Sequence, residues 1–442
     1  MASLLKGSTS RLLSYIKLNW IKKSTYRNSS FLACRGYIEE ALEQAKSNDI
    51  DFVPYRIRGY VLGNKFSNAN VDIVQYLEDV DGCVRDPSSV TKMELENGNV
   101  FTSSLKFSAL YHKAFESLER KYKNEENKLE FINDEILQFA IQSFVSVFLV
   151  QKEHHERCLR SVLETNEERK ITVLLANHLF SRLVATTPGN TYFITNDHFK
   201  KFELCPCADQ CGDKIWYGNS GIGSELLWYG KPDIMVFPLG GSCSIVLPKE
   251  KKKEMYIDEE KQLIEVKKES KLLRGHTNVS QFVSQTVTFS FYQKGFQLRK
   301  PKSFPQIVTM IPTIAISDKC FDVYMYDTEN DILLRNDGDP IPLWNNLDNP
   351  CDATLNMGAV LQLWMLINHL SVQPNLSPLE LEKFSLTCGF ASSLTHERLS
   401  RIEKEVTMRT KFLDHEIKEI KAPKSSFKRK LINSNNQHQS CQ

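Results

Sequence analysis

The pattern of apolar and polar residues changes twice along the chain. Apolar residues recur at helical spacing over much of residues 39–166, and helical spacing returns after about residue 350. Between 167 and 330, short apolar runs bounded by Gly, Pro and Asn indicate strands placed between helices. The order helix, several strands, helix, strand predicts an α/β core with helical regions on both sides.

We therefore expect the chain to divide into five segments. They are a basic, acid-poor N-terminal segment (1–38), a mainly helical region (39–166), the α/β core (167–330), a C-terminal helical region (331–400), and a charged helix with a basic tail (401–442). Within the core, helices are expected over 167–186 and 277–295, and the strands expected around them are 191–195, 224–230, 231–238, 241–248, 262–268, 304–318 and 320–327.

Composition narrows the class of protein. The chain has 442 residues, 41% of them hydrophobic and 25% charged, which is ordinary for a globular protein. A net charge of +2 argues against coating nucleic acid by bulk charge but allows a local basic groove. The longest apolar runs, near 139–151 and 358–370, are shorter than the roughly 20 residues of a membrane span. Eleven scattered cysteines favour an intracellular, reducing compartment.

The two ends carry signals for different organelles. Residues 1–38 hold seven Lys or Arg and no acid, and Leu12, Ile16 and Trp20 fall on one helical face. This pattern suits a mitochondrial presequence, and a basic amphipathic helix of the fold is the alternative. The last residues, from Lys421, hold five basic residues and no acid, which suits a nuclear address or a solvated tail.

Ionisable side chains interrupt two of the strands expected to be buried. Asp233 follows Pro232 in the run 231–238, and Glu265 and Lys267 lie in the run 262–268. Residues two apart in a strand project from the same face, so Glu265 and Lys267 share one face. If the two strands are neighbours, two carboxylates and an ammonium group meet. Mg²⁺ would relieve the repulsion between the carboxylates and could activate a water for attack on phosphorus.

Pro232-Asp233, followed by Glu265-Val266-Lys267, resembles the PD-(D/E)XK nuclease superfamily, whose restriction-endonuclease-like core is a mixed β-sheet flanked by helices. The resemblance covers about residues 167–320. It implies that Asp233, Glu265 and the backbone carbonyl of Val266 bind Mg²⁺, with Mn²⁺ as a substitute, and that Lys267 orients or activates the attacking water. The implied function is hydrolysis of phosphodiester bonds in DNA, with RNA not excluded.

Two glutamines extend the resemblance. In the phage- and RecB-like exonuclease branch, a helix after the lysine carries a Gln-x-x-x-Tyr motif. Here Gln281 occupies the glutamine position and Gln285 replaces the tyrosine. A further metal ligand from the preceding elements is common in the superfamily. The candidates are Glu225, on the strand expected before Asp233, and three residues of the expected helix, His178, Glu167 and Glu168, with Glu225 favoured because it is near.

Basic residues follow the second motif strand. Lys268, Lys271 and Arg274 lead into the helix expected from about residue 277. The free N–H groups and the dipole at a helix N-terminus favour a phosphate group. We expect these residues, with Gln281 and Gln285, to contact a nucleic-acid backbone.

Three cysteines lie within seven residues. Cys205, Cys207 and Cys211 suit Zn²⁺, which takes four sulfur or nitrogen ligands, and His198 is the candidate fourth ligand, with Cys243 as an alternative. The spacing differs from that of a two-plus-two zinc knuckle. Free thiols in a loop are therefore the competing interpretation.

Three functional hypotheses follow from these patterns. The first is a Mg²⁺-dependent nuclease, in which exonuclease or endonuclease action stays open. The second is an inactive nuclease fold that binds nucleic acid or acts as a scaffold. The third is an unrelated α/β protein in which Glu265 and Lys267 form ordinary cross-strand ion pairs. Retention of Asp233, Glu265 and Lys267 together favours the enzyme. The sequence sets no expectation for oligomeric state.

Overall fold

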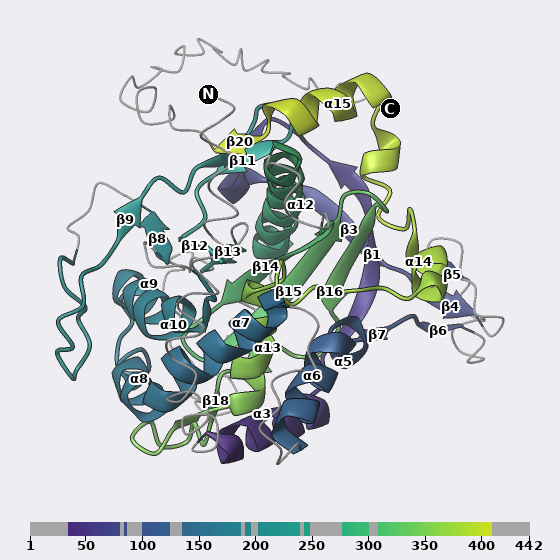
Figure 1. The fold of residues 1–442 in the computed structure, drawn as a ribbon. Helices are drawn as coiled ribbons and strands as arrows, with labels where there is room; N and C mark the ends of the chain where they lie inside the picture. Colours follow the sequence, from purple (N-terminus) through teal and green to yellow (C-terminus); the bar gives the residue numbers. More distant parts are fainter. Residues whose placement is uncertain are drawn as a thin grey trace, which may run out of the picture. The chain divides into compact units, whose positions relative to one another are not determined.

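The computed structural model describes residues 34–79, 84–85, 100–123, 135–186, 191–195, 202–238, 243–247, 276–299 and 308–408 (Figure 1). All of them fall in one compact unit. The N-terminal signal lies almost entirely outside these residues, and the basic tail lies wholly outside them. The run 262–268, with Glu265 and Lys267, lies outside them too.

A large mixed sheet organises the fold, in the order β3–β1–β16–β15–β14–β13–β12–β8–β9. Its strands are β1 (Asp51–Tyr60), β3 (Val71–Gln75), β8 (Tyr192–Thr195), β9 (Tyr217–Gly218), β12 (Ile234–Val236), β13 (Cys243–Val246), β14 (Met310–Ile316), β15 (Cys320–Asp327) and β16 (Ile332–Asn336). β7 (Leu105–Lys106) and β17 (Ile341–Pro342) pair with β1 and β15 off this path. Along the path, the pairs β13–β14 and β8–β9 are parallel and the others antiparallel. The expected α/β class, with a mixed sheet and helices, is confirmed.

The central strands are buried on both faces. Every residue of β14 and β15 is buried. Successive side chains point to opposite faces, so Ile314 joins one apolar core and Ala315 the other. A strand without a solvated face must be covered on both sides, and helices supply that cover.

The first core lies between the sheet and most of the helices. These are α3 (Arg35–Ser47), α5 (Phe107–Leu110), α6 (His112–Lys123), α7 (Glu135–Ser143), α8 (Lys152–Arg160), α9 (Glu168–Leu175), α10 (Ser181–Leu183) and α13 (Met357–Ile367). All eleven residues of α13 are buried, and the Asn356 side chain caps its first turn by accepting from the Ala359 N–H. A π-helical segment, Phe144–Phe148, and a 3-10 turn, Leu149–Gln151, join α7 to α8.

The second core lies under α12 (His276–Arg299), which packs on β14 and β15 (Figure 1). α15 (His396–Glu405) packs on α12, as does a small sheet of β2 (Asn64–Lys65), β10 (Ile222–Gly223), β11 (Trp228–Gly230) and β20 (Thr407–Met408). The helix was expected to end at Gly295 but continues to Arg299. A helical glycine costs about 1 kcal/mol. Here the Gln297 side chain bonds the backbone N–H and C=O of Val308 and holds the last turn in place.

The sheet crosses the segment boundaries expected from the sequence. Phe52 in β1 pairs with Asn336 in β16, which joins strands from both flanking regions to the core sheet. The boundaries near residues 166 and 330 therefore do not separate compact units. Residues 39–166 and 331–400 contribute strands as well as helices, because pairing partners far apart in sequence leave no local signal.

The remaining elements are short. β4 (Leu77–Asp79), β5 (Val84–Arg85) and β6 (Val100–Thr102) form one small sheet, and β18 (Trp344–Asn345) and β19 (Thr354–Leu355) form another. α14 (Pro378–Phe384) starts with a capping box between Ser377 and Glu380. Among the described helices, none combines the length and apolar character that a membrane span needs.

Candidate functional site

Asp233 lies at the start of β12, where three strands of the main sheet meet. It is half-buried, and its Oδ2 accepts a hydrogen bond from the backbone N–H of Leu247, 2.9 Å away, at the end of β13. On the other side, the N–H of Thr195 in β8 donates to the Asp233 carbonyl at 3.0 Å. These two hydrogen bonds hold Asp233 next to the C-terminal end of β13.

The residues expected to act with Asp233 lie outside the part of the chain that the structure describes. Glu265, Val266, Lys267, Lys268, Lys271 and Arg274 all lie outside the described residues. The described strands next to β12 are β8 and β13, and β13 belongs to the run expected over 241–248. The convergence of Asp233, Glu265 and Lys267 stays a prediction.

Glu225 was expected on the strand before Asp233, but it does not lie on a strand. It is exposed in a turn between β10 and β11. Ser224 forms this turn, its hydroxyl accepting from the Leu226 N–H at 3.1 Å and its carbonyl from the Leu227 N–H at 3.0 Å. Serine favours such turns because its side chain bonds the nearby backbone.

The two motif glutamines differ in exposure. Gln281 is half-buried in α12, whereas Gln285, one turn later, is fully buried. Only Gln281 of this pair therefore reaches solvent in this conformation.

A second group of candidate residues is much better defined. His178, Cys205, Cys207 and Cys211 present one ligand atom each, and these four atoms lie within 4.8 Å of one another. The His178 Nε2 is 3.2 Å from the Cys205 Sγ and 3.7 Å from the Cys211 Sγ. Cys205, Cys207 and His178 are buried, and Cys211 is half-buried. This His/Cys cluster can bind a metal ion.

The helix and the loop that form the cluster have unusual backbones. His178 lies in a π-helical segment, Ala176–Phe180, between α9 and α10; such segments are frequent at functional sites. The cysteines lie in the loop between β8 and β9, closed by hydrogen bonds between Cys205 N and Asp213 O (2.8 Å) and between Ile215 N and Glu203 O (3.2 Å).

Helix α8 brings a further set of residues to the same place. His154, Cys158 and His178 form a second candidate metal group, so His178 is shared. The Nδ1 atom of His155 is 3.4 Å from the Nδ1 of His178. Among the described residues, the His178–Cys211 cluster and the His154 group are the two sets of three or more His, Cys, Asp or Glu side chains close enough to hold an ion. Asp233 belongs to neither set.

Electrostatics keep the two buried histidines neutral. Burial and the nearby Arg182 charge lower the pKa of His178 to about 4 and that of His155 to about 3. For Cys207, burial opposes ionisation, but hydrogen bonds from the Cys211 backbone and from neighbouring thiols outweigh it, and its pKa falls below the usual value. A neutral imidazole and an ionisable thiol are the forms that bind metals.

The cluster adds a histidine that the sequence analysis had not assigned to zinc. The described histidine beside the cysteines is His178, while His198 lies outside the described residues. Cys243 is buried in β13 and is in neither metal group. The signal for His178 was a histidine inside an apolar helical run, which sequence reasoning had assigned to a Mg²⁺ site instead.

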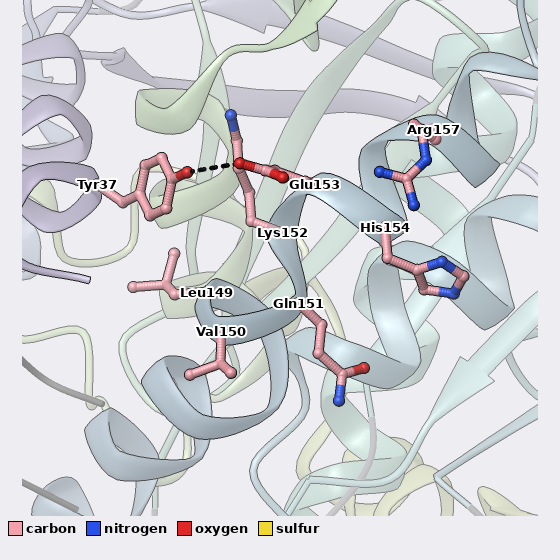
Figure 2. Close-up of a pocket in the computed structure, with 8 residues that line it drawn as sticks. All are labelled: Tyr37, Leu149, Val150, Gln151, Lys152, Glu153, His154 and Arg157. Atoms are coloured by element: carbon pink, nitrogen blue, oxygen red, sulfur yellow. Dashed lines mark hydrogen bonds between the residues drawn. The ribbon is translucent and has the colours of Figure 1, made fainter. Parts of the chain in front are cut away.

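A cavity of about 420 Å³ lies beside the first turns of α8 (Figure 2). Its lining residues are Tyr37, Leu149, Val150, Gln151, Lys152, Glu153, His154 and Arg157. The Tyr37 hydroxyl donates to a Glu153 carboxylate oxygen at 3.4 Å, and the Lys152 Nζ lies 5.1 Å from the Tyr37 ring centre. Asp233 and the glutamines of α12 are not part of this cavity.

Comparison of the chain with protein-family models, with curated proteins and with solved structures gave no match.

Proposed function

We propose that the protein is a metal-dependent nuclease that hydrolyses phosphodiester bonds in DNA, with RNA as an alternative substrate and Mg²⁺, or Mn²⁺ in its place, as the cofactor. The observation that carries the proposal is the position of Asp233. Its carboxylate lies next to the buried strand β12 and accepts a hydrogen bond from the Leu247 N–H, just after β13. In the sequence, Glu265 and Lys267 follow β13.

The side chain of Asp233 fits the metal that the motif implies. A carboxylate offers about four lone-pair positions, so the bond from Leu247 N–H is compatible with coordination of a cation. Mg²⁺ prefers oxygen ligands and, when bound, supplies a Lewis acid and lowers the pKa of water. Asp233, Glu265 and the Val266 carbonyl would hold the ion.

The remaining motif residues have complementary roles in this proposal. Lys267 orients the attacking water and stabilises the negative charge that develops on it. Lys268, Lys271 and Arg274 bind the phosphate backbone, and Gln281, which is half-buried in α12, contacts the substrate. The mixed sheet flanked by helices supports this assignment at the level of architecture.

The test is cleavage of end-labelled single- and double-stranded DNA and of RNA by the full chain, with Mg²⁺, Mn²⁺ or EDTA. We expect metal-dependent cutting that falls by about 100-fold or more in Asp233→Asn and in Lys267→Ala, because each removes a group that acts in the transition state. The matched control is Lys170→Ala, which removes a lysine from another Glu-x-Lys sequence at the start of α9 and should leave cutting unchanged.

Other outcomes would select the competing hypotheses. Salt-dependent binding of nucleic acid without cleavage under any metal condition would favour an inactive nuclease fold that acts as a binding module. Absence of both binding and cleavage would favour an unrelated α/β protein. An intracellular location, in the nucleus or the mitochondrion, belongs to the same proposal. A structural Zn²⁺ is a separate proposal.

A further inference from the structure

The cysteine loop between β8 and β9 is the part of the molecule whose chemistry the proposed nuclease does not use. Three thiols and one imidazole converge there from a loop and a helix. We infer that His178, Cys205, Cys207 and Cys211 bind one structural Zn²⁺ ion that fastens this loop to the α9–α10 helix. The inference is independent of the nuclease proposal.

The spacing of the ligand atoms suits zinc. With Zn–S bonds of about 2.3 Å and Zn–N bonds of about 2.0 Å, a tetrahedral site with three sulfurs and one nitrogen places its ligand atoms about 3.5–3.8 Å apart. The His178 Nε2 lies 3.2 Å from the Cys205 Sγ and 3.7 Å from the Cys211 Sγ, and all four ligand atoms fall within 4.8 Å of one another. Small side-chain movements would close the set around an ion.

The kind and number of ligands distinguish zinc from magnesium. Thiolates and imidazole are soft or borderline ligands that select zinc, whereas Mg²⁺ prefers oxygen. Three cysteines and one histidine form a complete four-ligand set with no position left for water, which is typical of structural sites. The cysteines also pack against the first apolar core, where uncompensated polar groups would be costly.

The surrounding polar groups support His178 as a ligand through Nε2. Its other nitrogen, Nδ1, lies 3.4 Å from the Nδ1 of His155, which is within reach of a hydrogen bond. Metal-binding histidines commonly make such a second hydrogen bond, which fixes the tautomer and the ring orientation.

A backbone N–H contacts one thiol, and charged groups fasten the loop to the helix. The Cys211 N–H donates to the Cys207 Sγ at 3.4 Å. Asp213 accepts from Asn177 at 3.1 Å and from Arg182 at 2.6 Å, which ties the loop to the same helix as His178. The Arg182 guanidinium also provides positive charge near a site that would carry three thiolates.

The second group does not form as complete a site. It has three candidate ligands, His154, Cys158 and His178, and His154 is half-exposed, with its Nδ1 3.5 Å from the Asp209 Oδ2. Because His178 is shared, one ion at the Cys205–Cys211 loop leaves only two ligands here. His154→Ala is therefore a control that removes a nearby histidine without removing a proposed ligand.

The first experiment is the zinc content of the full chain, purified without chelators, by elemental analysis. We expect one zinc per chain in the wild type, in His154→Ala and in His198→Ala, and loss of zinc in His178→Ala and Cys207→Ser. Loss in His198→Ala with retention in His178→Ala would overturn the ligand set. Absence of stoichiometric zinc from the wild type, with no tetrahedral cobalt spectrum when Co²⁺ is added, would overturn the site.

A measurement on the wild type alone avoids variants that fail to fold. Cys211 is half-buried, and Cys351 is an exposed cysteine outside the cluster. Alkylation followed by mass spectrometry should modify Cys351 at the same rate in all samples, and should modify Cys211 at least tenfold faster after a chelator is added. Equal rates at Cys211 with and without chelator would show free thiols. Neither result depends on whether the protein cuts DNA.

Discussion

At the residue scale, Asp331 shows how one buried carboxylate joins distant segments. It lies in the turn between β15 and β16 with φ of +52°, a conformation that Asp and Asn tolerate better than most residues. Its carboxylate accepts hydrogen bonds from the Tyr326 hydroxyl (2.9 Å), the Ala391 N–H (3.1 Å), and the Ser392 N–H and hydroxyl (both 3.0 Å). These bonds fasten residues 391–392 to the central hairpin.

We expect Asp331→Ala to lower the free energy of unfolding by about 3 kcal/mol, because it leaves several donors without an acceptor. Asp331→Asn should cost less, about 1–2 kcal/mol, since it keeps one acceptor oxygen and the tolerance of positive φ. Urea denaturation measures both, with exposed Asp348→Ala as the control. If Asp331→Ala matched that control, the carboxylate would not hold the segment.

The candidate sites differ in how far single residues could be predicted. The cysteines were singled out by their spacing, but the histidine beside them lies 27 residues before Cys205, in a helix. Spacing along the chain cannot show which histidine a fold brings to a loop. For Asp233 the structure adds a defined position at the start of β12, while its partnership with Glu265 and Lys267 stays a prediction.

At the element scale, the close packing of α13 on α3 depends on a missing side chain. A Cβ at Gly358 would lie 2.6 Å from the Ala45 nitrogen and 2.7 Å from the Gln44 carbonyl carbon, both backbone atoms that cannot rotate away. The Gly358 N–H also donates to the Gln44 side chain at 3.1 Å. The two helices can therefore approach this closely only with glycine at residue 358.

Gly358→Ala should destabilise the protein by about 1–3 kcal/mol, because α13 must move away from α3. The matched control is Gly36→Ala, in α3 itself, where a Cβ would meet nothing within 4 Å. That substitution should be neutral or stabilise by up to about 1 kcal/mol, since alanine favours the helix. Thermal unfolding of the two variants gives the comparison, and shifts of the same sign and size would refute the packing argument.

Element ends were harder to predict than the elements themselves. The apolar run that became α13 and the runs that became β14 and β15 were each placed from periodicity and length. The end of α12 was not predicted correctly, because tertiary contacts stabilise the helix beyond Gly295, as far as Arg299. A glycine is a local signal, and the contacts of Gln297 with Val308 that oppose it are not local.

At the scale of the whole molecule, the sheet draws strands from regions that looked independent in sequence. The class was predicted because the strand and helix patterns alternate between 167 and 330. The extent of the sheet was not predicted, because β1 pairs with β16 and the two strands are nearly 300 positions apart in sequence. Phe52, for example, pairs with Asn336. Neither strand carries a local sign of its distant partner, because pairing between remote segments is set by tertiary packing.

Burial of a histidine makes the stability of the whole molecule depend on pH. His369, just after α13, is fully buried, its Nδ1 lies 3.1 Å from the Leu366 carbonyl, and burial lowers its pKa to about 4. An unfolded chain has a histidine pKa near 6.5, so between about pH 6.5 and pH 4 the unfolded state binds more protons than the folded state. The contribution of His369 is therefore complete above about pH 6.5 and is lost as the pH falls toward 4.

We expect this loss to reach about 2–3 kcal/mol, from a slope of about 1.4 kcal/mol per pH unit. His369→Gln keeps a donor for the Leu366 carbonyl and removes the titration, so its urea-unfolding free energy should fall less steeply between pH 6.5 and pH 4. His155 and His178 also have lowered pKa values, and the difference between wild type and variant cancels their contribution because both chains keep them. Parallel pH profiles for the two proteins would mean that His369 takes up a proton as readily in the folded chain as in the unfolded one.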